Sequence, residues 1–497
     1  MQGKTAWYNL WANRIALLLV LLGIALRIIV YFQNRSLFLD EANLARNIAE
    51  QSFGGFFAPL DYHQYAPPLL GVIEKVLWLM LGSNELALRL FPLVLGLVLL
   101  VLFYVLCKQT IGQPGLWWFP LFMMAFSVFF LRYATEVKQY GTDAFSTCLL
   151  LFLALRHPPE RIGIRQIWLW LLIGMLIIWF SMPSVFVLSG VGLYYLHGFW
   201  KADNRKKLGR FSLVIAGWLF SFGLYYMAIL SADLSKDFLL DYHSVYFLPI
   251  LPTTGEEWSK LGNILLSLFN TAIGYTVWAY ILSAVFFLSG LIHLLQCDKI
   301  RLILFVVPLL SCFLASGSGF YSLMPRLTLF IIPVLLLIIA IGAEFIFLLL
   351  KPSFRPMLIL SLLSLIPLQK GYEYFFKPYQ IEEIRPVLAF VHEHQQTEDW
   401  IYLHEDALPA WHFYQFLHDK RERFQLENVA KAIGYDSVEA IIPNRDDKGV
   451  WLVFSHLLSD FSRQQLRQNR EIMGKTHRLE KTLELEGAAA YYYIPKN

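Results

Sequence analysis

Long apolar stretches recur through the first three quarters of the chain, and they restrict it to very few kinds of fold. The hydrocarbon core of a bilayer is about 30 Å thick, so a helix needs about 20 apolar residues to cross it. Of the 497 residues 57% are hydrophobic and 16% are charged, which excludes an ordinary cytosolic enzyme. We therefore predict a polytopic α-helical membrane protein with about eleven spans. The spans are expected at 15–32, 86–107, 115–131, 140–156, 166–181, 184–200, 210–231, 275–296, 301–316, 325–350 and 356–369.

The charges between the spans predict how the chain is oriented. The first stretch has no small-residue cleavage site, so we expect an uncleaved span. With the N-terminus inside the cell, the inner segments carry 15 Lys and Arg residues against three acidic ones, whereas the outer loop 34–85 is acidic. Positive residues concentrate on the cytoplasmic side. We therefore expect a multi-pass protein of the plasma (inner) membrane, with the loops 34–85 and 232–274 and the C-terminal region outside.

After Pro367 the composition changes to alternating charged and apolar residues. Residues 372–497 hold 15 Lys and Arg against 20 Asp and Glu, so the positive excess belongs to residues 1–371, where it sets topology and indicates no nucleic-acid partner. We expect two domains, a transmembrane domain at 1–371 and a small extracytoplasmic soluble α/β domain at 372–497. Local patterns predict helices at 381–396, 407–417 and 460–473, strands at 400–403 and 450–454, and a hairpin of 479–485 with 488–494.

The stretch Phe38–Ile48 follows the first span directly. Its apolar spacing predicts an amphipathic helix on the outer surface, with Asp40 and Glu41 at the start, where the helix dipole favours carboxylates. Asp40 as a simple helix cap is the plainer interpretation. A carboxylate at the membrane boundary is also able to abstract a proton from a hydroxyl group, or to hold a divalent cation beside a phosphate.

A second stretch, Tyr62–Leu70, contains His63 and a double proline that starts a new helix at Pro68. The helix-like run Leu69–Leu81 is about 20 Å long, too short to cross a bilayer. We expect it to lie along the interface, where the two helices after the first span would roof a groove. His63 is either a surface histidine or a ligand.

A third and a fourth stretch place further ionisable residues at the outer ends of spans. If 132–143 is helical, Arg132, Glu136, Tyr140 and Asp143 share one stripe, with the two acids about 10 Å apart along the axis. Such charges form a structural pair or a functional site. In the fourth stretch, which begins at Tyr321, Arg326 either snorkels to the headgroups or clamps a phosphate with its guanidinium fork.

These stretches resemble, in order, the motifs of a known enzyme family. The chain resembles polyprenyl-phosphate-dependent glycosyltransferases with the GT-C fold, in the branch named after protein O-mannosyltransferases, which includes the bacterial lipid A aminoarabinose transferase. The resemblance covers residues 10 to about 370 and implies a GT-C-like domain followed by a family-like outer domain. The motifs are Leu39-Asp-Glu-Ala, Ala66-Pro-Pro-Leu, Gly82–Arg89, Glu136–Tyr140 and Pro325–Pro333.

The resemblance implies that Asp40 is the base on an acceptor hydroxyl, which attacks the anomeric carbon of a polyprenyl-phosphate sugar with inversion. Glu41 and Glu136 are the other candidate catalytic carboxylates. Arg326 first, and Lys138 second, would stabilise the charge that develops on the phosphate. The other expected substrate-binding residues are Tyr140, Arg132, His63, Tyr321 and Asp143.

A bound divalent metal ion is a further hypothesis. Relatives with a metal site place an acidic residue just before the proline element, whereas this chain reads Gln64-Tyr-Ala-Pro. The candidate ligands here are Glu41, His63 and His243. Whether Glu136 or Asp143 is the second acid stays open.

Two other classes of function compete with the enzyme. A transporter or flippase of lipid-linked sugars would place ionisable residues near the midplane of discontinuous helices, whereas the charges singled out here crowd the outer face. A non-catalytic envelope scaffold would depend on residues 372–497 alone. The expected partners of the enzyme are the bilayer, the lipid-linked donor and an acceptor glycan, lipid or protein.

Overall fold

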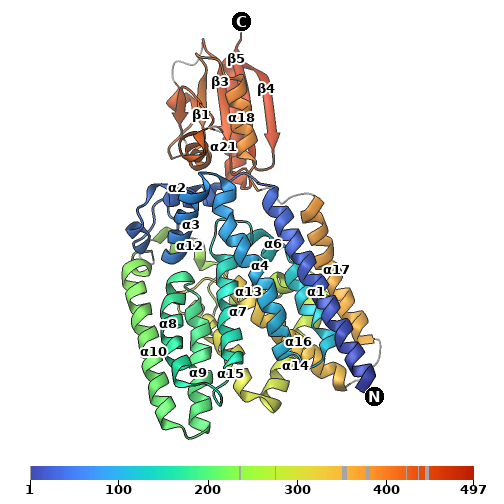
Figure 1. The fold of residues 1–497 in the computed structure, drawn as a ribbon. Helices are drawn as coiled ribbons and strands as arrows, with labels where there is room; N and C mark the ends of the chain where they lie inside the picture. Colours follow the sequence, from blue (N-terminus) through green and yellow to red (C-terminus); the bar gives the residue numbers. More distant parts are fainter. Residues whose placement is uncertain are drawn as a thin grey trace.

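A bundle of helices carries a small sheet-containing part at one end (Figure 1). The chain is seen here in a computed structural model. The bundle holds all of the elements up to α17, and we call the remainder, from residue 381 onward, the C-terminal part. The described residues are 2–496 except 234–236, 275, 350–354, 377–380, 421–422, 435 and 443–446.

Six helices of the described residues are long and apolar enough to cross a membrane, and the protein is a multi-pass membrane protein. The predicted spans all coincide with helices, although 115–131 is divided at Ser127, and residue 350 lies outside the described residues. The six are α1 (Gln2–Phe32), α4 (Glu85–Thr110), α10 (Arg205–Tyr225, continuing to Leu230), α14 (Val277–Cys297), α15 (Lys299–Gly317) and α16 (Ile332–Leu349). The other spans correspond to α5 (Trp118–Phe126) with α6 (Val128–Tyr133), α7 (Tyr140–Arg156), α8 (Ile164–Phe180), α9 (Ser184–Lys201) and α17 (Arg355–Phe376).

Helix α16 is held inside the bundle by a close contact with α14. A Cβ atom at Gly342 would lie 1.8 Å from the carbonyl oxygen of Phe286, and one at Gly290 would lie 2.2 Å from that of Ile338. Only glycine lets the two backbones approach so closely, which is the usual way in which membrane helices pack tightly. This contact fixes the helix that follows the Arg326 segment.

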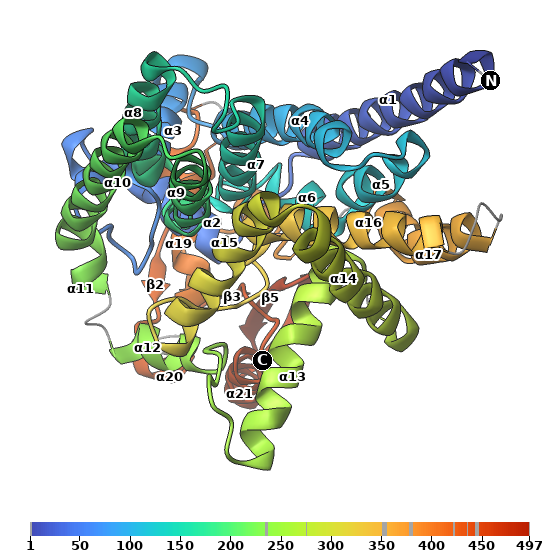
Figure 2. The same ribbon diagram turned by 90° about the horizontal axis from the view of Figure 1, so that it is seen from below.

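Two short helices lie at the end of the bundle that faces the C-terminal part (Figure 1). They are α2 (Leu39–Glu50), whose buried face includes Leu44 and Ile48, and α3 (Pro68–Leu81), which starts at a proline and ends at Gly82 with φ 103°. Both agree with the predicted short helices after the first span. At the same end, α12 (Asp237–Ser244) and α13 (Gly255–Ala272) reach out on the side of the bundle opposite to α1 (Figure 2). A short turn of helix, α11 (Ser231–Asp233), precedes them.

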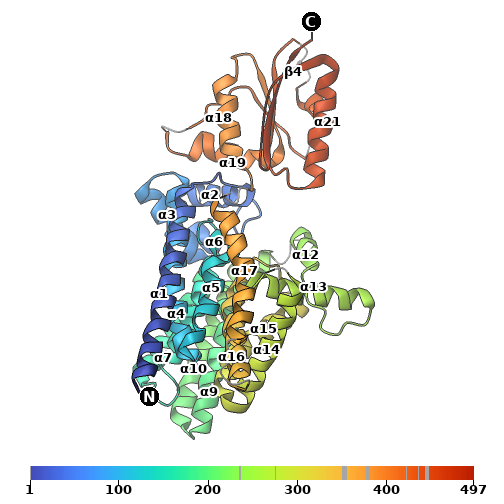
Figure 3. The same ribbon diagram turned by 90° about the vertical axis from the view of Figure 1, so that its right-hand side faces the viewer.

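The C-terminal part is a five-stranded sheet in the order β2-β1-β3-β5-β4, with β1 parallel to β2 and β3, and β5 antiparallel to β3 and β4. Helices α18 and α21 cover its two faces (Figure 3). The predicted strands, hairpin and flanking helices are present, whereas β2 is too short to show a pattern in the sequence. The elements are α18 (Ile384–His394), β1 (Trp400–Leu403), α19 (Leu408–His412), β2 (Val429–Lys431), α20 (Val438–Ile441), β3 (Val450–Phe454), α21 (Asp460–Thr476), β4 (His477–Leu485) and β5 (Ala488–Pro495).

Glu85, the first residue of α4, ties the C-terminal part to the bundle. Its Oε1 accepts hydrogen bonds from Arg385 at 2.7 Å and from the Tyr414 hydroxyl at 2.9 Å, and its Oε2 accepts one from His418 Nε2 at 2.9 Å. Apolar residues of α2 and α18 also share one core. The C-terminal part is therefore packed directly on the helix that carries Asp40.

Candidate active site

Asp40 is the second residue of α2 and faces two cations that come from other parts of the chain. Its Oδ2 lies 3.2 Å from Nη1 of Arg326, in the segment between α15 and α16, and 4.0 Å from Nζ of Lys138, in the turn between α6 and α7. The Asp40 side chain is 31% exposed, so a substrate has access to it. The structure thus brings together three of the residues that the sequence predicted for the site.

The stretch 132–143 is not one helix. Helix α6 ends at Tyr133 and α7 begins at Tyr140, so the expected stripe of four residues does not form. The chain turns back tightly here and brings Gly141 against the backbone of Tyr133. A Cβ atom at Gly141 would lie 2.6 Å from the carbonyl oxygen of Tyr133. The turn separates neighbours in the sequence: Lys138 faces Asp40, whereas Glu136 pairs with Arg132.

Lys138 is buried and is held in place by Gln64, whose Oε1 accepts a hydrogen bond from Nζ at 2.7 Å. Burial lowers the pKa of Lys138, while the nearby Asp40 charge opposes that shift. Gln64 lies just before the double proline, at the position where the metal-site pattern of the resembling family has an acidic residue. In this chain an amide there contacts both charged groups, since it also hydrogen bonds to Asp40.

The Asp40 carboxyl group is ionised at neutral pH. Lys138 holds the pKa of the Asp40 carboxyl below its usual range, and Arg326 and the hydrogen bond from Gln64 act in the same direction, against the effect of burial. A carboxylate in this state is ready to accept a proton from a hydroxyl group. Its weak basicity suits a reaction in which the leaving group departs easily.

Arg326 has donor capacity left after its pairing with Asp40. Within the described part of the chain its Nε is buried without a hydrogen-bond partner, and its guanidinium carbon lies 6.0 Å from the centre of the Tyr140 ring. Arg326 and Lys138 together place two positive charges around one carboxylate. The surplus of positive charge and the unused N–H donor suit a phosphate, which arginine binds through several hydrogen bonds.

Glu41 faces away from this cluster. Its Oε2 accepts a hydrogen bond from Arg89 Nη2 at 2.8 Å, and its Oε1 accepts one from the backbone N–H of Val137 at 2.9 Å. Both side chains of the Glu41–Arg89 pair are buried. Glu41 therefore anchors α2 to α4 and to the turn that carries Lys138.

Glu136 is fully buried beside Arg132, and burial raises the pKa of its carboxyl. In the described residues its Oε2 has no hydrogen-bond partner. Asp143 lies one turn into α7 and accepts a hydrogen bond from Ser181 at 2.7 Å. Neither acid is paired with Asp40, and the choice between them as second acid stays a prediction.

The remaining predicted residues have other surroundings. The Tyr321 hydroxyl donates to the carbonyl of Leu327 at 2.7 Å and so closes the turn that presents Arg326. His63 is exposed and has a left-handed backbone, with φ 53°. Arg132 lies over the Phe38 ring, with its guanidinium carbon 5.7 Å from the ring centre.

The three candidate metal ligands do not fit a metal ion. Both oxygens of Glu41 are taken by protein donors, and no group of three His, Cys, Asp or Glu residues suited to a metal occurs among the described residues. His243 lies near Arg326, whose positive charge adds to burial in lowering the pKa of His243. A cation beside that arginine would also be repelled.

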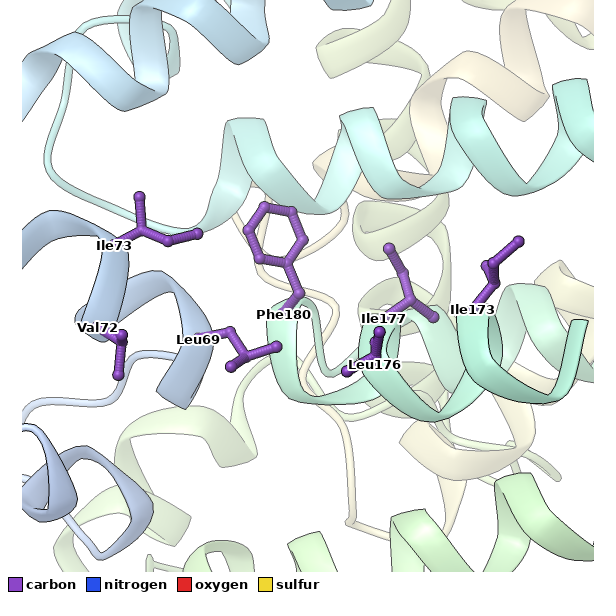
Figure 4. A pocket seen from close by; sticks show the side chains of 7 residues that line it. All are labelled: Leu69, Val72, Ile73, Ile173, Leu176, Ile177 and Phe180. Carbon is purple, nitrogen blue, oxygen red and sulfur yellow. The ribbon is translucent and has the colours of Figure 1, made fainter. Parts of the chain in front are cut away.

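An apolar groove of about 330 Å³ lies between α3 and α8 (Figure 4). α3 begins four residues after Gln64, so the groove starts at the helix that follows the site. Its lining is entirely apolar. The residues are Leu69, Val72, Ile73, Ile173, Leu176, Ile177 and Phe180.

Comparisons with known proteins find similarity to solved structures. No family model matches the chain, and no curated protein sequence is detectably similar to it. ArnT from Cupriavidus metallidurans in the apo state superposes with a TM-score of 0.53 at 11% identity, over 95% of this chain and 97% of that chain. The chain has the GT-C fold.

A second GT-C structure, ArnT from the same organism bound to undecaprenyl phosphate, gives a TM-score of 0.52 at 12% identity, with 95% of this chain and 97% of that chain covered. At such low identity the likeness concerns the fold. It confirms the fold class that the sequence predicted, a polytopic helical membrane protein with a small C-terminal α/β part.

The C-terminal part also contributes to the site, which sequence reasoning missed. Glu382 accepts a hydrogen bond from the backbone N–H of Leu39, the residue before Asp40, and it pairs with His456. No local pattern around Glu382 or His456 signals this, because the contact depends on how the C-terminal part packs on α2.

Proposed function

We propose that the protein is a membrane glycosyltransferase that moves a sugar from a polyprenyl-phosphate carrier to an acceptor hydroxyl group. The observation that carries the proposal is the convergence of Asp40 with Arg326 and Lys138 at the end of the bundle beneath the C-terminal part. The GT-C fold supports it, and one of the similar structures is described as bound to undecaprenyl phosphate. The bundle, residues 1–371, is the catalytic domain in this proposal, and residues 372–497 form a soluble domain over the site.

In the proposed reaction Asp40 accepts the proton of the acceptor hydroxyl, whose oxygen attacks the anomeric carbon. The bond from that carbon to the phosphate oxygen breaks, and the anomeric configuration inverts. Negative charge grows on the departing phosphate, where fixed cations stabilise the transition state most effectively. Arg326 and Lys138 supply that charge, and no step needs a general acid.

We propose that the reaction takes place at the outer face of the plasma (inner) membrane, with the N-terminus in the cytoplasm. The excess of Lys and Arg in the segments at the far end of the bundle supports this orientation. The donor sugar and the acceptor, whether glycan, lipid or protein, are not specified by the residues of the site.

The decisive experiment is a transfer assay on purified protein with a panel of undecaprenyl-phosphate sugars. Asp40→Asn keeps the shape of the side chain but removes the base, and we expect kcat to fall by about 10²–10⁴-fold, the usual contribution of a general base. Asp460→Asn, on an exposed carboxylate of α21, serves as the control and should keep the wild-type rate. Full activity of a correctly folded Asp40→Asn protein would refute the assignment.

A further inference from the structure

Helix α2, which carries Asp40, does not cap its own N-terminus. The N-cap residue is Phe38, which has no side-chain acceptor, and the N–H group of Leu39 instead donates to Oε2 of Glu382 at 3.0 Å. An N-cap acceptor normally comes from the cap residue itself. Here it comes from a residue 343 positions further along the chain, at the start of the C-terminal part.

The Glu382 carboxylate is buried and accepts two more hydrogen bonds from Ser455 and His456, the two residues that follow β3. The Ser455 hydroxyl donates to Oε2 at 3.0 Å, and Nδ1 of His456 donates to Oε1 at 2.6 Å. One carboxylate thus joins the first turn of α2 to the central strand of the sheet. The His456 side chain is 36% exposed. The backbone of His456 is in the left-handed region, with φ 57°, which is uncommon for residues other than glycine.

The turn between β4 and β5 holds both partners of this pair. The backbone carbonyl of Gly487 accepts a hydrogen bond from the N–H of Leu457 at 3.1 Å. The backbone carbonyl of Glu486 accepts one from the N–H of Glu383 at 2.8 Å. A Cβ atom at Gly487 would lie 1.9 Å from the carbonyl oxygen of Ile381, and its φ is 67°, so only glycine fits. The segments that carry Glu382 and His456 are therefore fixed to each other by the fold of the C-terminal part.

The charges around His456 favour its protonated form. Its hydrogen bond to Glu382 raises the pKa of His456, and the charges of Glu382, Asp406 and Asp40 act in the same direction, against the effect of burial. His404 is a further titratable group that interacts with His456. Burial first, and the charge of His456 second, lower the pKa of His404 to about 4.

We propose that Glu382 and His456 are positioning residues that hold the first turn of α2, and with it Asp40, in place. Because the pKa of His456 is raised, the stabilisation that its protonated form gives to the folded state is fully present below the ordinary histidine pKa of about 6.5. This stabilisation is lost as the pH rises through the raised pKa. The cap itself does not depend on the proposed function. Its importance for catalysis does, because that rests on Asp40 as the base.

The experiment is hydrogen exchange on the full-length protein in detergent, followed at the backbone amides of 39–43. We expect Glu382→Met, which has a similar side-chain length but no oxygen acceptor, to raise their exchange rate about fivefold, the factor that corresponds to one lost cap. In the wild type their protection, corrected for intrinsic rates, should be higher at a pH below about 6.5, the ordinary pKa of histidine, than at a clearly alkaline pH. His456→Gln should show low protection at both values and no such pH dependence.

Matched controls come from the same part of the chain. Glu393→Met and His392→Gln change exposed residues of α18 and should behave like the wild type. Unchanged exchange at 39–43 in Glu382→Met, or faster exchange throughout the sheet as well, would overturn the proposal. The transfer assay then tests the link to catalysis: Glu382→Met should lower kcat with little change in KM, and an unaltered kcat with the cap lost would disprove that link.

Discussion

At the scale of single residues, the site is defined by one carboxylate and two cations that differ in how they are held. Lys138 is buried and fixed by Gln64, whereas Arg326 is partly exposed and keeps a buried Nε without a partner in the described part of the chain. The two cations therefore have separable effects. Lys138 mainly sets the charge state of Asp40, and Arg326 is the better placed to bind a phosphate.

Arg326→Ala should weaken the binding of undecaprenyl phosphate to the purified protein. Hydrogen bonds to charged groups contribute about 1.5–3 kcal/mol, which corresponds to a loss of affinity of about 10–100-fold. Titration of the protein with undecaprenyl phosphate, followed by intrinsic tryptophan fluorescence, measures this. Arg463→Ala, at an exposed site of α21, should leave the affinity as it is. An equal affinity in the two variants would exclude Arg326 from the phosphate site.

Lys138→Met should shift the acid limb of the pH profile of kcat/KM upward. Lys138 is the largest cause of the lowered pKa of Asp40, so its removal raises that pKa. The wild type should keep its activity to lower pH than the variant. Lys420→Met, which removes an exposed lysine, provides the comparison. Superimposable profiles would show that Lys138 does not act on the base.

At the scale of elements, α2 depends on contacts to three other segments. Glu41 binds it to α4 and to the 134–139 turn, and Glu382 caps it from the C-terminal part. Neighbouring carboxylates at 40 and 41 thus have different surroundings, because successive positions of a helix point about 100° apart. Asp40 is partly exposed in the site, and Glu41 is buried in an ion pair.

Breaking the Glu41–Arg89 pair should destabilise the protein strongly. Removal of one partner leaves a buried charge without compensation, at a cost of about 3–5 kcal/mol. Chemical unfolding in detergent should show this for Glu41→Gln, with a smaller loss in the double variant Glu41→Gln/Arg89→Met. The exposed pair of Asp203 and Arg205 is the reference, and Asp203→Asn should unfold like the wild type. A Glu41→Gln protein of unchanged stability would contradict the anchoring role.

Much of the element scale was predictable from local patterns. The spans, α2, the start of α3 at Pro68 and the strands β1 and β3 follow from apolar periodicity and proline position. The break between Tyr133 and Tyr140 was not predictable in this way, because the polar residues there are compatible with a helix and the close approach of Gly141 to Tyr133 is visible only in the folded chain. Strand β2 was missed because three residues carry no period.

At the scale of the whole molecule, the C-terminal part sits on the end of the bundle that carries the candidate site, and the α9–α10 turn lies at the other end (Figure 1). The proposed orientation places these two ends on opposite sides of the membrane. The Glu85 contacts hold the C-terminal part against the bundle, so its position over the site is part of the fold.

Cysteine labelling of intact cells tests this orientation. In a Cys297→Ala background, a cysteine introduced by Glu398→Cys in the C-terminal part should react with a membrane-impermeant maleimide from outside. One introduced by Lys206→Cys, at the α9–α10 turn, should react only after permeabilisation. Labelling in the reverse pattern would put the site on the cytoplasmic side and refute the proposed location of the reaction.

Hydropathy, charge and helix starts are properties of neighbouring residues, so the amino-acid sequence alone was enough to predict a membrane protein, the approximate positions of its spans and the charged residues near their ends. The packing of distant segments, in contrast, brings Asp40 to Arg326 and Lys138, buries Glu41 with Arg89 and lets Glu382 cap α2. These contacts join segments from about 50 to nearly 350 positions apart. They depend on helix packing and on the turn at 134–139, which no local pattern encodes.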